Sequence, residues 1–131
     1  MYKGTVIAAA GVVGSGFAFA ALTEAHFVTL QQSDMLSSNL VGLDVYDTAK
    51  TDIGKIQDIA FDNSKAVKGY VISVGGFLGL GSRYVVVDPA SVNVIYDAAN
   101  KKWHAGMNAT KDQLKTTPEF KYEGIWNPSK S

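Results

Sequence analysis

The chain has 131 residues, of which 47% are hydrophobic, and its 12 Lys plus Arg balance its 12 Asp plus Glu. This composition is typical of one globular domain, and the charge balance argues against nucleic acid as a partner, because such binding needs a basic patch. The chain contains no cysteine, which excludes disulfides, thiol catalysis and cysteine-ligated metal centres.

The N-terminal segment has the pattern of a signal peptide. Lys3 precedes residues 4–22, which carry no charge, and the small residues Ala18 and Ala20 stand before Ala21. A positive end, an apolar run and a small-x-small site are typical of a segment that is cleaved after export. We therefore expect cleavage between Ala20 and Ala21.

An uncleaved membrane anchor is the alternative interpretation of the same segment. A helix over residues 4–22 spans about 28 Å, close to the thickness of the hydrocarbon core. Either interpretation places the following domain outside the cytoplasm, because Lys3 holds the N-terminus inside. We expect a periplasmic or exported protein, or else an inner-membrane anchored one with its domain outside the cytoplasm. A membrane contact is expected only if residues 1–20 are retained.

The remaining chain divides into a polar linker over 21–39, a domain over 40–120 and an aromatic tail over 121–131. Within the domain, β-branched and aromatic runs alternate with turn-forming residues and predict short strands. The predicted strands are Leu40–Tyr46, Ile53–Phe61, Ala66–Val74, Arg83–Asp88, Val92–Asp97 and Lys102–Met107.

Six short strands are too few for two full sheets, and closure into a small barrel would remove the exposed edges. Val71 and Val85, in the most apolar runs, are expected in its core. Thr110 and Gln113 have the spacing of a capping box, so one short helix should follow the strands and end before Pro118. The expected fold is therefore mainly β: a six-stranded barrel with one short C-terminal helix, preceded by the apolar signal or anchor helix.

A glycine-rich loop is the most unusual local feature. A phosphate loop is disfavoured here, because no Gly-Lys-Ser/Thr ending is present and a strand rather than a helix follows. We interpret the loop as a structural turn, formed by Gly75, Gly76, Gly79 and Gly81. The turn displays three apolar side chains that are candidates for a partner interface, Phe77, Leu78 and Leu80.

No residue pattern predicts catalysis, a cofactor or a metal. The aspartates fall mostly at strand ends and turns, where their side chains bond to the local backbone. His26 and His104 lie far apart in sequence. Arg83, the only arginine, is expected to pair with a nearby carboxylate such as Asp58 or Asp88. The chain is therefore not expected to be an enzyme.

Two sequence elements resemble those of the PRC-barrel domain family. These are the Ile-Gly-x-Ile-x-Asp element at residues 53–58 and the glycine–Phe–Leu loop that ends at Gly81. The resemblance continues through residues 40–47, 84–89 and 109–114. It implies a small β-barrel that acts as an adaptor, without catalytic residues.

The expected function is a non-enzymatic protein-binding or scaffolding module of the bacterial periplasm or envelope. Its partner would be another protein or a second copy of the chain, so a homodimer is one expected state. The alternative is a membrane-anchored accessory subunit of an energy-transducing complex, photosynthetic or respiratory, resembling the reaction-centre H subunit.

Overall fold

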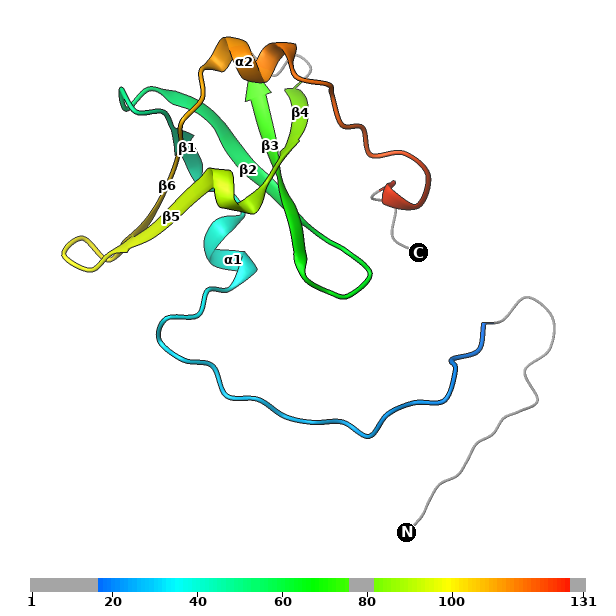
Figure 1. Ribbon diagram of the computed structural model, residues 1–131. Coiled ribbons are helices and arrows are strands. Elements are labelled where there is room, and N and C mark those ends of the chain that lie inside the picture. The colour runs from blue at the N-terminus through cyan, green and yellow to red at the C-terminus, as the bar shows by residue number, and fades with distance from the viewer. Residues whose placement is uncertain (1–16, 76–81, 128–131) are drawn as a thin grey trace. The chain divides into compact units, whose positions relative to one another are not determined.

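The structure is a computed structural model in which residues 17–75 and 82–127 are described (Figure 1). The chain divides into two units, Met1–Gln31 and Gln32–Ser131. The described residues of the first unit are exposed and contain no helix or strand. The helix expected over residues 1–20 falls mainly outside the described part of the chain. Among the described residues, no helix is both long and apolar enough to cross a membrane.

The second unit is mainly β, as the sequence predicts. Among its described residues, one sheet contains six strands, and two short α-helices and two 3₁₀ turns accompany it. In chain order these elements are α1 (Ser37–Leu40), β1 (Asp44–Tyr46), β2 (Asp52–Phe61), β3 (Val67–Gly75), β4 (Ser82–Val87), η2 (Pro89–Ser91), β5 (Val92–Asp97), β6 (Lys102–Met107), α2 (Lys111–Thr116) and η3 (Gly124–Trp126).

The strands follow the order β4-β3-β2-β1-β6-β5 across the sheet. Neighbouring strands are antiparallel except β1 and β6, which are parallel and bring the start of the domain beside its last strand. Register shifts interrupt β2 between Ile56 and Asp58 and again between Ala60 and Phe61. Such bulges bend a strand and increase its twist, and the bent β2 runs through the centre of the sheet in Figure 1.

The expected closed barrel is wrong for the described residues, because the sheet has two ends. β4 forms one end and β5 forms the other, and no ladder joins them. At the outer edge of β4, Tyr84 instead forms an isolated bridge with Phe120. Phe120 belongs to the segment that follows α2, residues 117–127, which is called the C-terminal tail from here on. The tail therefore occupies hydrogen-bonding groups that a closing strand would need.

Two hairpin turns are built in the same way from an aspartate and a left-handed lysine. Asp47 accepts backbone N–H bonds from residues 49 and 51, and Asp62 accepts them from residues 64 and 66. Lys50 and Lys65 each have positive φ, at 66° and 73°. The aspartates thus cap turns, as the sequence predicts, and these turns set the β1–β2 and β2–β3 pairings.

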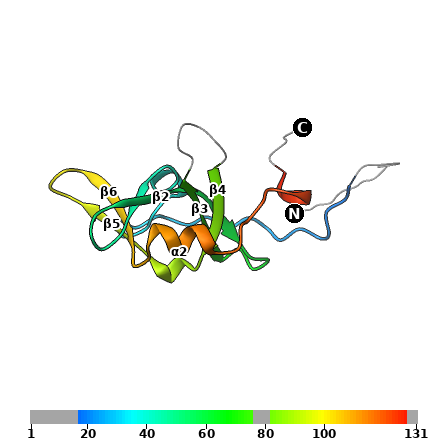
Figure 2. The ribbon, with the colours of Figure 1, turned by 90° about the horizontal axis from the view of Figure 1, so that it is seen from above.

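The core lies on one face of the sheet. Its fully buried side chains come from β1 to β4 and are Val45, Ile53, Ile56, Ile72, Val74 and Val85. Leu114 of α2 joins the same cluster, which explains why α2 lies against the end of β3 (Figures 1 and 2). The predicted capping box of α2 is confirmed, since Thr110 and Gln113 exchange side-chain bonds with each other's backbone.

The first predicted strand is too long at its N-terminal end. Residues 37–40 form the single turn of α1, and β1 begins only at Asp44. Leu40 is buried in the core, whereas its polar neighbours are mostly solvent-accessible. A single buried leucine in a polar stretch shows neither the 3.6-residue period of a helix nor the two-residue period of a strand. The sequence pattern therefore could not predict this helical turn.

Candidate functional site

An aromatic cluster lies on the face of the sheet opposite the core. Tyr84 of β4 meets Tyr122 of the tail edge to face, with ring centroids 5.5 Å apart. Phe120 lies 4.9 Å from Tyr122 and 5.4 Å from Trp126, again between ring centroids. We call these four residues the aromatic cluster. It joins the C-terminal tail to β4, beside which the tail runs in Figures 1 and 2.

Polar contacts fix the tail in this place. The guanidinium of Arg83 donates to the carbonyl oxygen of Thr117 and forms an ion pair with Glu119 at 3.6 Å. The N–H of Phe120 donates to the carbonyl oxygen of Tyr84 at 2.7 Å. Arg83 thus pairs with a carboxylate, as expected, but the carboxylate is Glu119 and not Asp58 or Asp88.

The two aspartates are engaged elsewhere. Asp88 caps η2 by accepting the N–H of Ala90 at 2.9 Å. Asp58 Oδ2 accepts the hydroxyl of Tyr122 at 2.9 Å. Partial burial, reinforced by this hydrogen bond to Asp58, raises the pKa of Tyr122 above its ordinary value. Tyr122 is therefore a protonated donor over the whole physiological range.

A hollow of about 670 Å³ adjoins the aromatic cluster, and we call it the aromatic hollow. Val71 of β3 lies at its floor and is only 3% exposed. In the sheet register Val71 stands between Asp58 and Val86, so all three share the outer face. Phe61 and Trp126 also line the hollow, and they remain 59% and 58% exposed.

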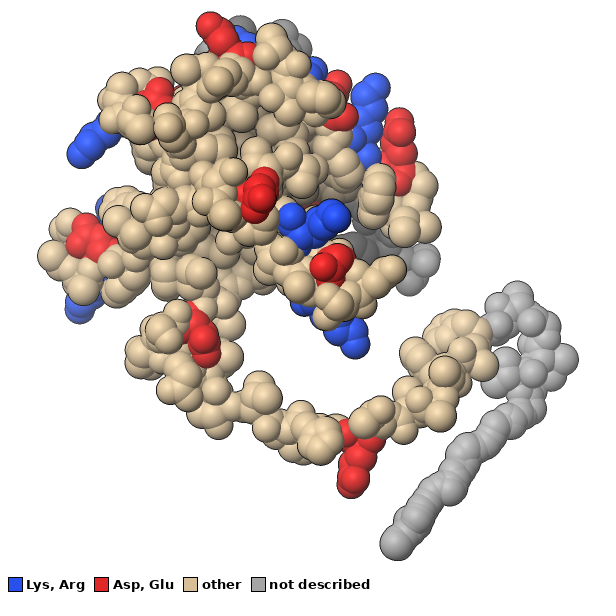
Figure 3. All heavy atoms as spheres, viewed as in Figure 1, with Lys and Arg blue, Asp and Glu red and all other residues tan. Residues whose placement is uncertain are grey.

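Charged groups surround the apolar part of the hollow. Asp58, Asp62 and Lys68 line it. Hydrogen bonds from the Ser64 hydroxyl and the Ala66 N–H lower the pKa of Asp62, so this carboxylate is ionised at neutral pH. On the face drawn in Figure 3, acidic and basic side chains are interspersed rather than gathered by sign. The hollow itself is lined by two carboxylates and one lysine, so it offers apolar contact together with local negative charge.

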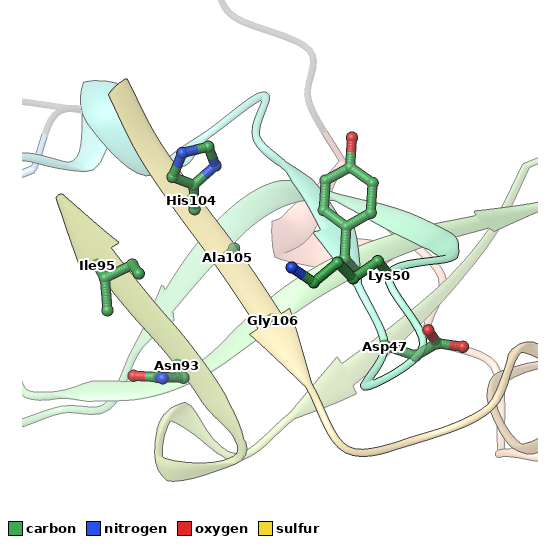
Figure 4. A pocket seen from close by; sticks show the side chains of 8 residues that line it. Asp47, Lys50, Asn93, Ile95, His104, Ala105 and Gly106 are labelled. Atoms are coloured by element: carbon green, nitrogen blue, oxygen red, sulfur yellow. The ribbon is translucent and has the colours of Figure 1, made fainter. Parts of the chain in front are cut away.

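A second hollow lies over β6, between β1 and β5 (Figure 4). Gly106 lies in its floor, because it has no side chain between Tyr46 of β1 and the residues of β5. His104 and Ile95 lie side by side on β6 and β5. His104 Nε2 lies 3.5 Å from the Asp97 carboxylate, and its side chain is 47% exposed. The described residues contain no group of His, Asp or Glu side chains that could hold a metal ion.

Of the site residues predicted from the sequence, the structure describes Gly75 and the three alanines at the expected cleavage position. Gly75 ends β3 with φ of 79°, in the left-handed region that favours glycine. The rest of the glycine-rich loop, with Phe77, Leu78 and Leu80, lies outside the described residues. Ala18, Ala20 and Ala21 are exposed.

Sequence reasoning noticed the tail aromatics but missed the strand residues that meet them. The nearly continuous apolar runs of β3 and β4 were the available signal, because such runs indicate strands covered on both faces. Val71 and Val86 are the residues that this signal could have assigned to the second face.

Comparison with known proteins identifies one family. A family model described as PRC-barrel domain matches residues 33–114, which is more than half of the chain. No curated protein matches the chain.

Proposed function

Because the chain belongs to the PRC-barrel domain family, whose domain suggests a small protein-interaction module, we propose that it is a non-enzymatic protein-binding and scaffolding module of the bacterial periplasm or envelope. The aromatic hollow is its binding surface. This surface lies on the outer face of β2 to β4, away from the core.

The observation that carries this proposal is the exposure of two large aromatic side chains around a preformed hollow. Phe61 and Trp126 line the hollow from separate parts of the chain and are both more than half exposed. Tryptophan is enriched at the energetic centre of protein interfaces. Burying one such side chain contributes about 1.5–3 kcal/mol, so these two residues can anchor a partner.

The charge of the hollow indicates the chemistry of the partner. Asp58 and Asp62 outnumber Lys68 among the charged side chains that line it. A partner segment with an apolar anchor and a neighbouring Lys or Arg would match this surface, because a cation gains from both the carboxylates and the aromatic faces.

The proposal that the module is not an enzyme draws support from how the aspartates are used. Asp47, Asp62, Asp88 and Asp97 all accept backbone N–H bonds within their own turns. Such bonds hold each carboxylate in a structural role. These aspartates belong to separate turns along the chain, so they serve the fold at different places.

The proposed location depends on the uncharged segment over residues 4–22 and on the small residues around position 20. Mass spectrometry of the N-terminus, after separation of the membrane and periplasmic fractions, tests this part. A soluble chain that begins at Ala21 supports export and cleavage. A chain that begins at Met1 in the membrane fraction supports the retained anchor, and one confined to the cytoplasm contradicts both.

Affinity capture from the native envelope tests the binding surface. The variant Phe61→Ser/Trp126→Ser should lose the captured protein while its melting temperature stays close to that of the parent chain. Ile125→Ser is the matched control, since Ile125 is 95% exposed, stands next to Trp126 in sequence and does not line the hollow. Equal capture by the parent chain and the double variant would contradict the proposed surface.

A further inference from the structure

The two edge strands of the sheet differ in whether another segment of the chain pairs with their outer edge. The edge of β4 is engaged by Phe120 of the tail. At the other end, the described residues give β5 only one partner strand, β6. β5 therefore presents unpaired backbone N–H and C=O groups along its outer edge.

β5 also lacks three of the features that commonly protect an edge strand, namely lysine, proline and a bulge. Its sequence, Val-Asn-Val-Ile-Tyr-Asp, contains no proline and no lysine. Its register with β6 runs without a shift from Val92 opposite Met107 to Asp97 opposite Lys102. Natural edge strands are usually blunted by lysine, proline or a bulge, so this regular strand can accept another strand.

Side chains on both faces of β5 remain exposed. Ile95 is 52% exposed on the outer face, which it shares with Asn93 and Asp97 because side chains alternate along a strand. Tyr96 is 50% exposed on the other face, where its ring lies 5.1 Å from that of Trp103. A strand added beside β5 would cover apolar surface on both faces of the sheet.

We propose that the occupant of this edge is a second copy of the chain, whose β5 pairs antiparallel with the first across a two-fold axis at Ile95. A symmetric antiparallel pair must place one residue opposite itself, and side chains opposite each other share a face. The axis could pass through Val94 or through Ile95 near the middle of the strand. The side chains decide between the two.

An axis at Ile95 gives the better match along the strand. It places Ile95 opposite Ile95, Asn93 opposite Asp97, and Val94 opposite Tyr96. Apolar side chains then lie opposite apolar ones, and polar side chains opposite polar ones. An axis at Val94 would instead place Asn93 opposite Ile95. Aliphatic and aromatic neighbours across strands stabilise a sheet, and the chosen register puts no like charges opposite each other.

This inference is independent of the proposed function, because the aromatic hollow involves the opposite end of the sheet. The two therefore fail separately. A protein that stays monomeric but captures an envelope partner through Phe61 and Trp126 would refute self-pairing and leave the proposed function standing.

Sedimentation of the full chain with a charged variant tests the edge directly. We expect the parent chain to be a dimer at micromolar concentration and Ile95→Lys to be a monomer, because two lysines would stand opposite each other at the axis. Val41→Lys is the control, since Val41 is 44% exposed and lies outside β5. Circular dichroism verifies that both variants are folded.

A cross-linking experiment tests the register without destabilising the pair. The chain has no cysteine, so a single introduced one can only react with its counterpart in another copy. At Ile95→Cys the two Cα atoms would be about 4.5–5.5 Å apart, within the range that a disulfide bridges. At Asn93→Cys, on the same strand and face, they would be about 14 Å apart. We expect the first variant to form a covalent dimer at least tenfold faster than the second.

Three results would overturn the inference. A parent chain that is monomeric at all concentrations has no such dimer. A dimer that survives Ile95→Lys uses another surface, and equal cross-linking at both cysteines rules out the two-fold at Ile95. If Ile95→Lys instead abolishes capture of a different protein by a monomeric parent chain, the edge belongs to that protein.

Discussion

Two glycines show how closely neighbouring strands approach in this sheet. A Cβ at Gly69 would lie 2.8 Å from Val86 Cγ1 and 2.8 Å from the carbonyl oxygen of Val87. A Cβ at Gly54 would lie equally close to Ile72 and to the carbonyl oxygen of Ser73. Because a backbone oxygen cannot move aside as a flexible side chain does, these positions require glycine.

We expect Gly69→Ala to lower the free energy of unfolding by about 1–3 kcal/mol, the usual cost of overpacking. Urea denaturation measures this change. Gly106→Ala is the control in the same sheet, since its Cβ would lie 3.5 Å from the nearest atom, the carbonyl oxygen of Tyr46. Equal stability of the two variants would mean that β3 and β4 do not approach as closely as described.

The turn at Asp62 makes stability depend on pH. Hydrogen bonds from Ser64 and Ala66 hold the pKa of Asp62 below its ordinary value, so the folded state favours the ionised carboxylate. The ionised Asp62 makes its full contribution to the free energy of unfolding above the pKa that its carboxyl has in the unfolded chain, about 3.9. That contribution is lost as the pH falls through the lower pKa of Asp62 in the folded state.

We therefore expect Asp62→Asn to be less stable than the parent chain at neutral pH and to approach it in stability near pH 2. Thermal unfolding over this pH range provides the measurement. A difference in stability that stays constant down to pH 2 would show that ionisation of Asp62 contributes nothing to the turn.

Among the elements of the fold, the C-terminal tail depends on a few contacts with β4. Arg83 holds the carbonyl oxygen of Thr117, and the N–H of Phe120 bonds to Tyr84. The ion pair with Glu119 is partly exposed and longer, at 3.6 Å. Exposed ion pairs contribute little to stability, so the bond from the guanidinium to the backbone should matter more.

Hydrogen exchange of the Phe120 amide separates these contributions. Arg83→Met should increase its exchange rate by about 10- to 100-fold, because a hydrogen bond to a charged group is worth about 1.5–3 kcal/mol. Glu119→Gln should change the rate by less than about threefold. The amide of Ile72, in the core, should keep its protection in both variants. An unchanged Phe120 amide in Arg83→Met would show that Arg83 does not hold the tail.

The elements themselves were largely predictable, whereas their long-range arrangement was not. β5 and β6 match the predicted ranges because each alternates and is bounded by turn residues. The open sheet was missed because closure depends on which distant segment reaches the edge of β4. Phe120 is the residue that bridges to this edge, and no local pattern encodes that contact.

The same limit applies to the candidate site. The aromatic residues of the tail stand out in the sequence, and so does the apolar character of β3. Val71 and Phe120 line the same hollow only because the tertiary structure brings β3 and the tail together. Local periodicity tells which face of a strand is apolar, but it does not tell which distant segment covers that face.

In the second unit as a whole, the sheet carries apolar side chains on both faces. Water can approach those beside the aromatic hollow, whereas it is excluded from those in the core. Val85 is fully buried in the core, whereas Val71 is buried at the floor of the open aromatic hollow. The sequence predicts both as core residues, and both are indeed buried, but in the register of β3 and β4 they point to opposite faces. The two positions should therefore respond differently to the same polar substitution.

Replacement of each valine by threonine keeps the shape of the side chain and adds one hydroxyl group. At Val85 the hydroxyl would be buried without water, so we expect the free energy of unfolding to fall by about 1–3 kcal/mol. At Val71 water that enters the hollow can bind the hydroxyl, and the loss should be less than about half as large. Chemical denaturation of the two variants measures the difference. Equal losses would mean that the tail seals the outer face as tightly as the core, and the aromatic hollow would then be closed to any partner.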